Sequence, residues 1–181
     1  MKKINEIFYS LQGEGYHTGT PAVFIRFAGC NLQCSFCDTA HYEGMWMTDE
    51  EILQTVEQYP TRTVVLTGGE PSLQIDEALI SLLHGGNRYI CIETNGTRPL
   101  PAGIDWVTCS PKEEAPVVLR RIDEIKVVYQ AQDLTPYEQL PATHYFLQPC
   151  SCRNTDEVVN YALQHPQWRV SLQTHKLINI P

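Results

Sequence analysis

Short runs of apolar, often β-branched residues recur along the chain, and they constrain its fold more than any other feature. The main runs span residues 22–29, 63–69, 88–94, 105–110, 123–130, 144–149 and 169–174. A shorter run of the same kind lies at 4–10, near the N-terminus. Most of these runs are dense rather than strictly alternating, which is typical of strands covered on both faces. We therefore expect a mostly parallel sheet.

Three of the segments between these runs carry helix signals. Thr48 and Glu51 have the spacing of a capping box ahead of apolar helix positions. Ser72 is expected to cap a second helix, and Asn154 or Thr155 a third. Strands that alternate with helices in this way indicate parallel strands joined by helical crossovers.

The alternation predicts an α/β fold with the form of an abbreviated, incomplete (β/α) barrel. We expect about six mostly parallel strands with about three main helices. The chain of 181 residues suits a single domain over 1–181. Ligands bind at the carboxyl ends of the strands in such folds. Polar residues that suit a ligand site do follow several runs, namely Cys30, Thr67, Asn95, Lys112 and Gln148.

Composition and charge narrow the class of protein. Thirteen basic and 21 acidic side chains give a formal net charge of −8. A nucleic-acid or anionic-membrane binder needs a basic face, so neither partner is expected. No secretory signal and no membrane-spanning run is recognisable. The seven cysteines form an odd set, which does not suggest a disulfide framework. We expect a cytoplasmic location, where such cysteines stay reduced.

Three of the cysteines, Cys30, Cys34 and Cys37, lie close together with the spacing C-x3-C-x2-C. Such a loop can turn three thiolates toward one point. Three protein ligands leave a metal centre one open position, which is the mark of a reactive site. Thiolates suit iron–sulfur clusters and zinc. A structural zinc site with His41 as fourth ligand is one alternative, and three coincidental core cysteines are another.

Together with the turn Gly68-Gly69-Glu70-Pro71, this loop resembles the radical S-adenosylmethionine (SAM) enzymes. In that family three cysteines hold a 4Fe–4S cluster, whose fourth iron binds SAM, and an electron from the cluster cleaves SAM to a 5′-deoxyadenosyl radical. The resemblance makes Cys30, Cys34 and Cys37 the cluster ligands. It also implies a radical-SAM barrel and an electron donor of the flavodoxin or ferredoxin type.

Further motifs resemble one family of radical SAM enzymes, the 7-carboxy-7-deazaguanine synthases of queuosine biosynthesis. The matching segments are Leu11–Gly15, Arg26, Cys37–Thr39, Leu66–Pro71, Glu93–Gly96, Ser110–Lys112 and the tail Ser171–Lys176 with Pro181. The resemblance implies contraction of the ring of 6-carboxy-5,6,7,8-tetrahydropterin, with loss of ammonia. It also implies a magnesium ion, held through the hydroxyl of Thr39. Without the family match, a turn-capping role for Thr39 would be the simpler interpretation. A glycyl-radical activase is an alternative within the superfamily.

The expected substrate contacts follow from the chemistry of a carboxypterin. Its guanidine-like edge offers N–H donors, which Gln12, Glu14 and the terminal carboxylate of Pro181 can accept. Its carboxylate suits a cation such as Arg26, with His175 nearby. An internal salt bridge is the alternative for Arg26. The remaining expected substrate contacts are Leu11, Gly13 and Thr67.

SAM is expected to contact residues of the cluster loop and of four further strand ends. The expected residues are Phe36, Cys37, Asp38, Gly69, Glu70, Thr94, Asn95, Ser110, Pro111, Lys112 and Gln148. Gly69 and Glu70 are expected to face the methionyl group. Because the predicted barrel is incomplete, we also expect a homodimer that covers exposed surface.

Overall fold

The computed structural model describes residues 1–37, 39–112 and 115–181. In these ranges the chain forms nine strands. They are β1 (Lys2–Leu11), β2 (Pro21–Phe27), β3 (Met45–Met47), β4 (Thr63–Gly68), β5 (Tyr89–Thr94), β6 (Trp106–Cys109), β7 (Ile122–Tyr129), β8 (Ala142–Pro149) and β9 (Trp168–Val170). The five α-helices are α1 (Asp49–Val56), α2 (Glu77–Gly85), α3 (Thr135–Glu138), α4 (Thr155–Gln164) and α5 (Thr174–Ile178). Two single turns of 3-10 helix span Pro71–Leu73 and Cys150–Cys152.

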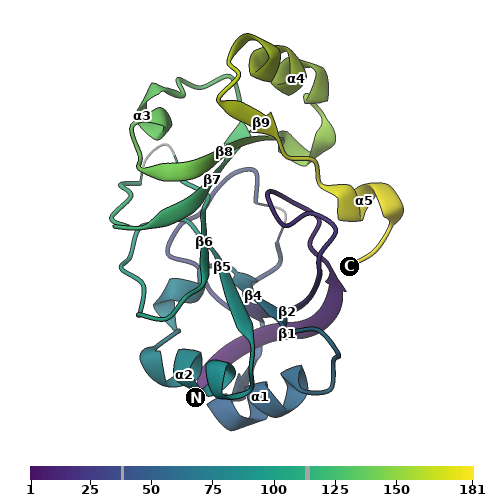
Figure 1. Cartoon of the computed structure of the whole chain (residues 1–181), viewed down its shortest axis with the longest axis vertical. Coiled ribbons are helices and arrows are strands. Elements are labelled where there is room, and N and C mark those ends of the chain that lie inside the picture. The colour runs from purple at the N-terminus through teal and green to yellow at the C-terminus, as the bar shows by residue number, and fades with distance from the viewer. Residues whose placement is uncertain (38, 113–114) are drawn as a thin grey trace.

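All nine strands belong to one sheet in the order β3-β1-β2-β4-β5-β6-β7-β8-β9. The pairs from β2 to β9 are parallel, whereas β1 runs antiparallel to both β2 and β3. The sheet curls around a central space without closing, as Figure 1 shows. The expected incomplete barrel is therefore confirmed, with more strands and helices than the sequence indicated. The additional elements, β3, α3 and α5, are only three to five residues long.

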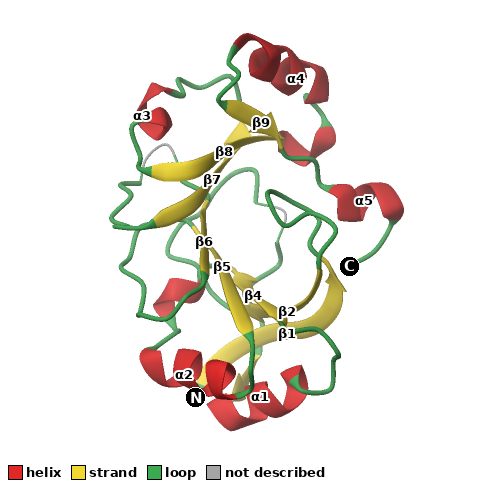
Figure 2. Cartoon of the chain, in the orientation of Figure 1, coloured by secondary structure: helices red, strands yellow, loops and turns green. Residues whose placement is uncertain are grey.

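Helices α1 and α2 cover the outer face of β2, β4 and β5, on the lower side of Figure 2. Ile52 and Val56 of α1 and Leu79 and Leu83 of α2 are fully buried there. The capping box of α1 is present, because Thr48 and Glu51 each bond the other's backbone N–H. This reciprocal pair fixes where α1 begins.

The prediction that Ser72 caps the second helix is wrong. Ser72 lies inside the 3-10 turn, and Asp76 caps α2 by accepting a hydrogen bond from the backbone N–H of Leu79. The carboxylate of Glu70 caps the 3-10 turn instead, through the backbone N–H of Ser72. Several acceptor side chains lie within a few residues of the start of α2, and each could serve as its cap. Local backbone geometry decides which of them does, and sequence spacing alone does not reveal that choice.

A second apolar cluster supports the carboxyl-terminal half of the sheet. Buried Ile125, Val127 and Leu147 pack with Val158 of α4 and Trp168 of β9. Helix α4 begins at Thr155 after Asn154, as the sequence predicts, but neither side chain caps it. Asn154 Oδ1 accepts the backbone N–H of Cys150 instead, and Thr155 Oγ1 donates to the carbonyl of Cys152. Its position on β8 and β9 keeps the last two strands in register.

The segment 12–20 enters the interior of the curled sheet (Figure 1). Tyr16 stacks on Trp106 and His144, with ring centroids 4.8 and 4.5 Å apart. Both partners lie near the amino ends of their strands, so the aromatic stack fills that end of the barrel. The opposite end, at the carboxyl ends of the strands, stays open to a ligand.

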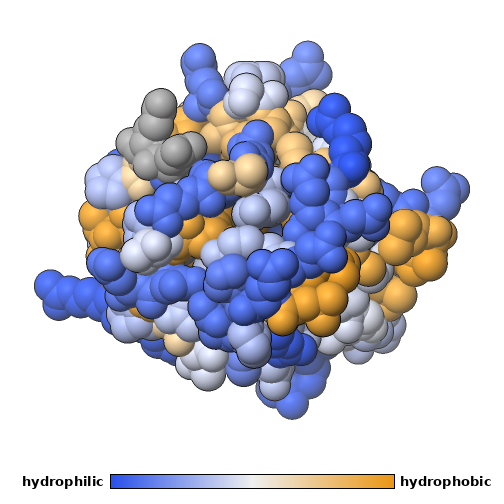
Figure 3. Space-filling view, turned by 90° about the horizontal axis from the view of Figure 1, so that it is seen from above, coloured by the Kyte–Doolittle hydropathy of each residue, from blue (hydrophilic) through white to orange (hydrophobic). Residues whose placement is uncertain are grey.

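The face seen in Figure 3 is mainly hydrophilic, with separate apolar patches. Among the described residues, none of the helices is long and apolar enough to cross a membrane.

Candidate active site

A cavity of about 570 Å³ opens at the carboxyl ends of the parallel strands. Most of the residues that the sequence singled out line it: Leu11, Gln12, Gly13, Glu14, Arg26, Cys30, Cys34, Phe36, Cys37, Thr39, Thr67, Gly69, Thr94, Asn95, Ser110, Lys112, Gln148, His175 and Pro181. Glu70 and Pro111 do not line it. The predicted contact at Asp38 lies outside the described residues. Segments far apart in the sequence thus converge on one site.

The cysteine loop forms one wall of this cavity. Cys30, Cys34 and Cys37 all line it with free thiols, and Cys37 is exposed. The backbone N–H of Cys37 bonds the carbonyl of Cys34 at 3.1 Å, which closes the loop into a tight turn. Burial raises the pKa of the Cys30 thiol, and the nearby charges of Glu70 and the other two thiols add to this effect. Three soft donors grouped on one wall fit an iron–sulfur cluster.

The mononuclear zinc alternative receives no support from the geometry of the described residues. Among them, no three His, Cys, Asp or Glu side chains converge closely enough to hold a single metal ion. His41 lines the same cavity, and its buried Nδ1 has no hydrogen-bond partner in the described part of the chain. Ligands of a cubic cluster bind separate corners, so the three thiols need no common point.

The turn after β4 packs tightly against the cysteine loop. A Cβ atom on Gly69 would lie 2.0 Å from the carbonyl oxygen of Gly29. The backbone N–H groups of Gly69 and Glu70 bond the carbonyls of Phe27 and Gly29 at 3.1 and 2.8 Å. Besides any contact with a ligand, the glycine is therefore required for the close approach of two backbones.

The structure gives Glu70 a different role from the one expected. Its side chain is fully buried and turns away from the cavity. Its carboxylate accepts hydrogen bonds from Thr94 Oγ1 and the Asn95 backbone N–H, both at 2.7 Å, and from the Ser72 backbone N–H at 2.9 Å. Glu70 thus ties the end of β4 to the end of β5.

Thr94 and Asn95 line the cavity and also donate hydrogen bonds that hold Glu70. The side chain of Asn95 donates to Asn31 Oδ1 at 3.0 Å, which links β5 to the cysteine loop. The hydroxyl of Thr94 also accepts the backbone N–H of Gly96 at 3.1 Å. Both side chains are held rigidly, so the wall they form is preorganised.

Lys112 presents a cation next to the cysteine loop. Its Nζ donates to the carbonyl and the hydroxyl of Ser110 and lies 6.0 Å from the centroid of the Phe36 ring. Burial lowers the pKa of the Lys112 amine, because a charged amine loses solvation there. An anionic group in the cavity would oppose this shift.

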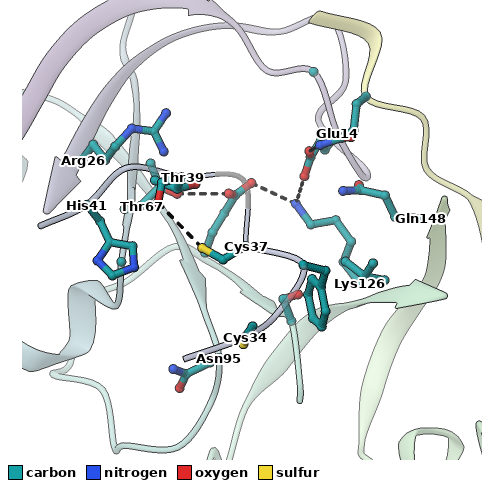
Figure 4. Close-up of a pocket in the computed structure, with 18 of the residues that line it drawn as sticks. Glu14, Arg26, Cys34, Cys37, Thr39, His41, Thr67, Asn95, Lys126 and Gln148 are labelled. Carbon is teal, nitrogen blue, oxygen red and sulfur yellow. Dashed lines mark hydrogen bonds and ion pairs between the residues drawn. The ribbon is translucent and has the colours of Figure 1, made fainter. Parts of the chain in front are cut away.

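The far wall carries a buried charge network, drawn in Figure 4. Lys126 Nζ lies 2.6 Å from Glu14 Oε2 and 3.2 Å from Glu93 Oε1. Gln12 Nε2 and Thr67 Oγ1 donate to the two oxygens of Glu93 at 3.0 and 3.2 Å. Two carboxylates therefore line one cavity with a shared ammonium between them.

The glycines around Glu14 allow this network to pack. A Cβ atom on Gly13 would lie 2.1 Å from Nδ1 of His175. Gly15 has a φ of 66°, and a Cβ there would lie 2.0 Å from Glu124 Oε1. The carbonyl of Gly13 accepts hydrogen bonds from the N–H and hydroxyl of Thr174, which fastens α5 beside the cavity.

A second, closed cavity of about 10 Å³ lies next to this network. Gln12 and Glu93 separate it from the main cavity, and His17 and Glu124 also line it. The buried atoms His17 Nε2 and Glu124 Oε1 have no hydrogen-bond partner among the described residues. The volume suits about one water molecule.

The sequence allowed Arg26 either an internal salt bridge or a contact with a ligand anion, and its position is compatible with both. Its Nε donates to Glu6 Oε1 at 2.7 Å, so the internal salt bridge is present. Its guanidinium also lies over the ring of Phe8, 5.6 Å from the centroid, and lines the cavity. The remaining N–H groups of the fork can still bind an anion.

The last segment of the chain completes the rim. Ser10 Oγ donates to the Pro181 oxygen at 2.8 Å, and Gln173 Nε2 donates to Glu14 Oε1 at 2.9 Å. On the opposite side, Gln148 Oε1 accepts a hydrogen bond from Ser171 Oγ at 3.0 Å. These bonds fasten the tail to β1 and β8.

Three residues of the charge network were given no role of their own by the sequence analysis, namely Glu93, Lys126 and Gln173, although Glu93 and Gln173 lie in matching segments. Glu93 and Lys126 are charged residues inside otherwise apolar strand runs. A buried charge needs a partner, so their placement was a usable signal. A salt bridge was considered for Arg26, but none was considered for Glu93 or Lys126.

With the site described, comparison with known proteins places the chain in its family. Residues 24–131 match the model of the radical SAM superfamily, so the chain belongs to that superfamily. It is 68% identical to the 7-carboxy-7-deazaguanine synthase of Bacteroides thetaiotaomicron, with 99% of each chain covered. It is 43% identical to the enzyme of that name from Bordetella pertussis, with 98% of each covered.

A solved structure agrees with these relatives. The crystal structure of QueE from Escherichia coli superposes with a TM-score of 0.79 at 31% identity, and the match covers 94% of this chain and 93% of that one. The chain belongs to the 7-carboxy-7-deazaguanine synthase family. The resemblance stated from the motifs is thereby confirmed. Membership of the superfamily brings with it a 4Fe–4S cluster and SAM.

Proposed function

We propose that the protein catalyses the radical SAM ring contraction of 6-carboxy-5,6,7,8-tetrahydropterin to 7-carboxy-7-deazaguanine, with loss of ammonia. The supporting observation is that the carboxylates of Glu14 and Glu93 line the same cavity as the three cysteine thiols. The N–H groups of a pterin edge need acceptors of this kind. The protein would then be a lyase of deazapurine biosynthesis.

Cys30, Cys34 and Cys37 would hold the cluster, whose open position binds SAM. When bound, the cluster and SAM would together supply a 5′-deoxyadenosyl radical for hydrogen abstraction at C6 of the substrate. Lys112 would pair with the carboxylate of SAM. This role is supported by the position of its Nζ, 6.0 Å from the centroid of the Phe36 ring in the cysteine loop. Phe36, Gly69, Thr94, Asn95, Ser110 and Gln148 form the surrounding wall.

The chain's own residues orient the substrate. Glu14 and Glu93 accept hydrogen bonds from the pterin edge, while Gln12 and Thr67 hold Glu93 in place. Arg26 binds the substrate carboxylate with the N–H groups that Glu6 leaves free. His175, packed against Gly13, and Pro181 close the rim. Positioning of this kind determines which hydrogen meets the radical.

The decisive experiment uses cluster-loaded protein under anaerobic conditions. It is incubated with SAM, a strong reductant and the carboxytetrahydropterin, and the product is followed by mass spectrometry. We expect 7-carboxy-7-deazaguanine and ammonia in equal amounts. Reductive SAM cleavage without any deazaguanine would refute the substrate, and colourless zinc-loaded protein would refute the class of chemistry.

The proposal includes a magnesium ion held by Thr39 and the substrate. A single hydroxyl is a weak ligand, and magnesium commonly shares anionic substrate oxygens. Thr39→Ala should therefore reduce the stimulation of turnover by added Mg²⁺ more than it reduces SAM binding. An undiminished Mg²⁺ response in this variant would remove Thr39 from the metal site.

Three further elements belong to the proposal: a flavodoxin- or ferredoxin-type electron donor, a homodimer and a cytoplasmic location. All seven cysteines are free, which suits a reducing compartment. Exposed Tyr42, Met45 and Trp46 leave apolar surface for a partner. Light scattering of the purified protein tests the dimer, and turnover with a purified flavodoxin in place of chemical reductant tests the donor.

A further inference from the structure

Lys126 occupies an unusual position for a charged residue. It lies within β7 between apolar neighbours, and only 4% of it is exposed. Its ammonium contacts carboxylates from two other parts of the chain, Glu14 after β1 and Glu93 on β5. Figure 4 shows the Lys126 side chain reaching to the carboxylate of Glu14.

A purely structural ion pair is the simplest explanation of this contact. Buried ion pairs seldom stabilise a fold more than apolar packing would, because desolvation offsets the attraction. All three members of this cluster line the open cavity, rather than the apolar core. The arrangement therefore controls the charge and geometry of the cavity wall, whatever its effect on folding.

We propose that Lys126 is a positioning residue, which holds the carboxylates of Glu14 and Glu93 in place as acceptors in the cavity wall, so that both accept hydrogen bonds from the pterin edge. This inference rests on the proposed function. Lys126 acts through the two carboxylates and need not touch the substrate.

The physical reason is the charge of Glu14 and the hydrogen bonds that Lys126 donates to Glu14 and Glu93. An ionised carboxylate only accepts hydrogen bonds, whereas a protonated one also donates. Burial raises the pKa of Glu14, but the charge and hydrogen bond of Lys126, together with the hydrogen bond of Gln173 and the charge of His175, hold this pKa below its ordinary value. Burial in turn lowers the pKa of the Lys126 amine, and the surrounding glutamates raise it above its ordinary range. Without the ammonium, the buried carboxylate of Glu14 would lose the opposite charge beside it, and its pKa would rise.

Other charged groups face the same cluster from the elements packed around it. They are Glu124 of β7, Lys112 after β6 and His175 of α5. Lys112 and His175 lie beyond the direct contacts, so they cannot replace the hydrogen bonds that Lys126 makes. Burial raises the pKa of Glu124 to about 7, so this group adds negative charge near the ammonium only as the pH rises through that value.

The test compares Lys126→Met with Lys126→Arg and wild type. Steady-state kcat/KM for the carboxytetrahydropterin is measured from pH 5.5 to 9 with the cluster-loaded enzyme and saturating SAM. We expect Lys126→Met to raise KM about tenfold or more at pH 7 and to move the acid limb of kcat/KM upward by about one pH unit or more. Raising the pH should restore much of the lost kcat/KM, because the carboxylate of Glu14 ionises again. Lys126→Arg, which keeps the charge, should leave the acid limb near that of wild type.

Lys3→Met is the matched control, because Lys3 is a cation outside the cavity whose ammonium bonds the carbonyl of Tyr42. Its profile should coincide with that of wild type. If Lys126→Met does not fold or load iron, Lys126→Gln carries the same test. The position of the acid limb of kcat/KM in Lys126→Arg is then an independent check of the proposal.

Two outcomes would overturn the inference. One is a Lys126→Met profile that equals wild type, and the other is a loss by the same factor at every pH, which would indicate a merely structural role. An upward shift of the acid limb in Lys126→Arg as large as in Lys126→Met would also overturn it. A wild-type enzyme that forms no deazaguanine refutes the proposed function instead, so the two failures are distinguishable.

Discussion

Among single residues, the two glutamates of the charge network have well-defined hydrogen-bond partners. Glu93 accepts hydrogen bonds from Gln12, Thr67 and Lys126, and Glu14 accepts from Lys126 and Gln173. These donors fix each carboxylate in one orientation. A group held in this way loses little freedom when a ligand binds, which favours tight and selective recognition.

Glu93→Gln tests whether Glu93 contacts the substrate. The amide keeps the shape of the side chain but presents one donor to the pterin edge. A hydrogen bond to a charged group contributes about 1.5–3 kcal/mol, so KM for the carboxytetrahydropterin should rise roughly tenfold to a hundredfold. Glu43→Gln, at an exposed position, is the control. A KM that stays at the wild-type value would show that Glu93 does not bind the substrate.

Replacing Cys30, Cys34 or Cys37 singly by Ala tests the cluster ligands. Each variant should lose most of its iron and all reductive SAM cleavage, while its circular dichroism spectrum stays native. Cys152→Ala should keep both, because Cys152 is a free thiol that does not line the cavity. Full SAM cleavage in any of the three variants would exclude that cysteine as a ligand.

At the scale of elements, the strand ends are joined by side chains as well as by the sheet. Glu70 links the turn after β4 to the end of β5, and Asn95 links β5 to the cysteine loop. Backbone bonds from Gly69 and Glu70 join the same turn to the end of β2. The cavity wall is therefore one connected unit, built from short loops that could not hold these positions separately.

Glu70→Ala should destabilise this unit strongly. The substitution leaves buried donors on Ser72, Thr94 and Asn95 without their acceptor. We expect a loss of about 2–4 kcal/mol in the free energy of unfolding, measured by urea denaturation. Glu157→Ala, at an exposed position on α4, should change it by less than about 0.5 kcal/mol. Equal effects of the two substitutions would contradict the bracing role of Glu70.

At the scale of the whole molecule, the curled sheet brings acidic groups from distant segments into one interior. Burial raises the pKa of Glu124 to about 7, and the attraction of Lys126 only partly opposes this. Between pH 4.5 and 7 the folded protein therefore holds a proton that the unfolded chain has released. Stability conferred by this group must fall as the pH rises through that window.

Glu124→Gln tests this effect, because the amide stays neutral at every pH. The difference in unfolding free energy between variant and wild type should move in favour of the variant by up to roughly 3 kcal/mol between pH 4.5 and 8. Urea denaturation at several pH values measures it. A difference that does not change with pH would mean that Glu124 ionises normally in the fold.

Much of the fold could be predicted because it depends on local patterns. Dense apolar runs predicted the strands, and Thr48 with Glu51 predicted the start of α1. The short elements were not predicted, since a strand of three residues such as β3 is too short to show a recognisable hydrophobic period. The boundary of α2 was misplaced because three polar side chains, Glu70, Ser72 and Asp76, compete within seven residues as caps.

The sequence by itself determined the class of chemistry and the family. Three cysteines at fixed spacing and a set of short motifs identify both, because those residues act through their own chemical groups. The bracing contacts of the buried Glu70 side chain and the position of Lys126 between Glu14 and Glu93 arise only in the folded chain. The contacts of Glu70 with Thr94 and Asn95, and of Lys126 with the two glutamates, join residues 24 to 112 positions apart in the chain. Their energies come from burial and from neighbouring charge, which exist only after the sheet has curled around its interior.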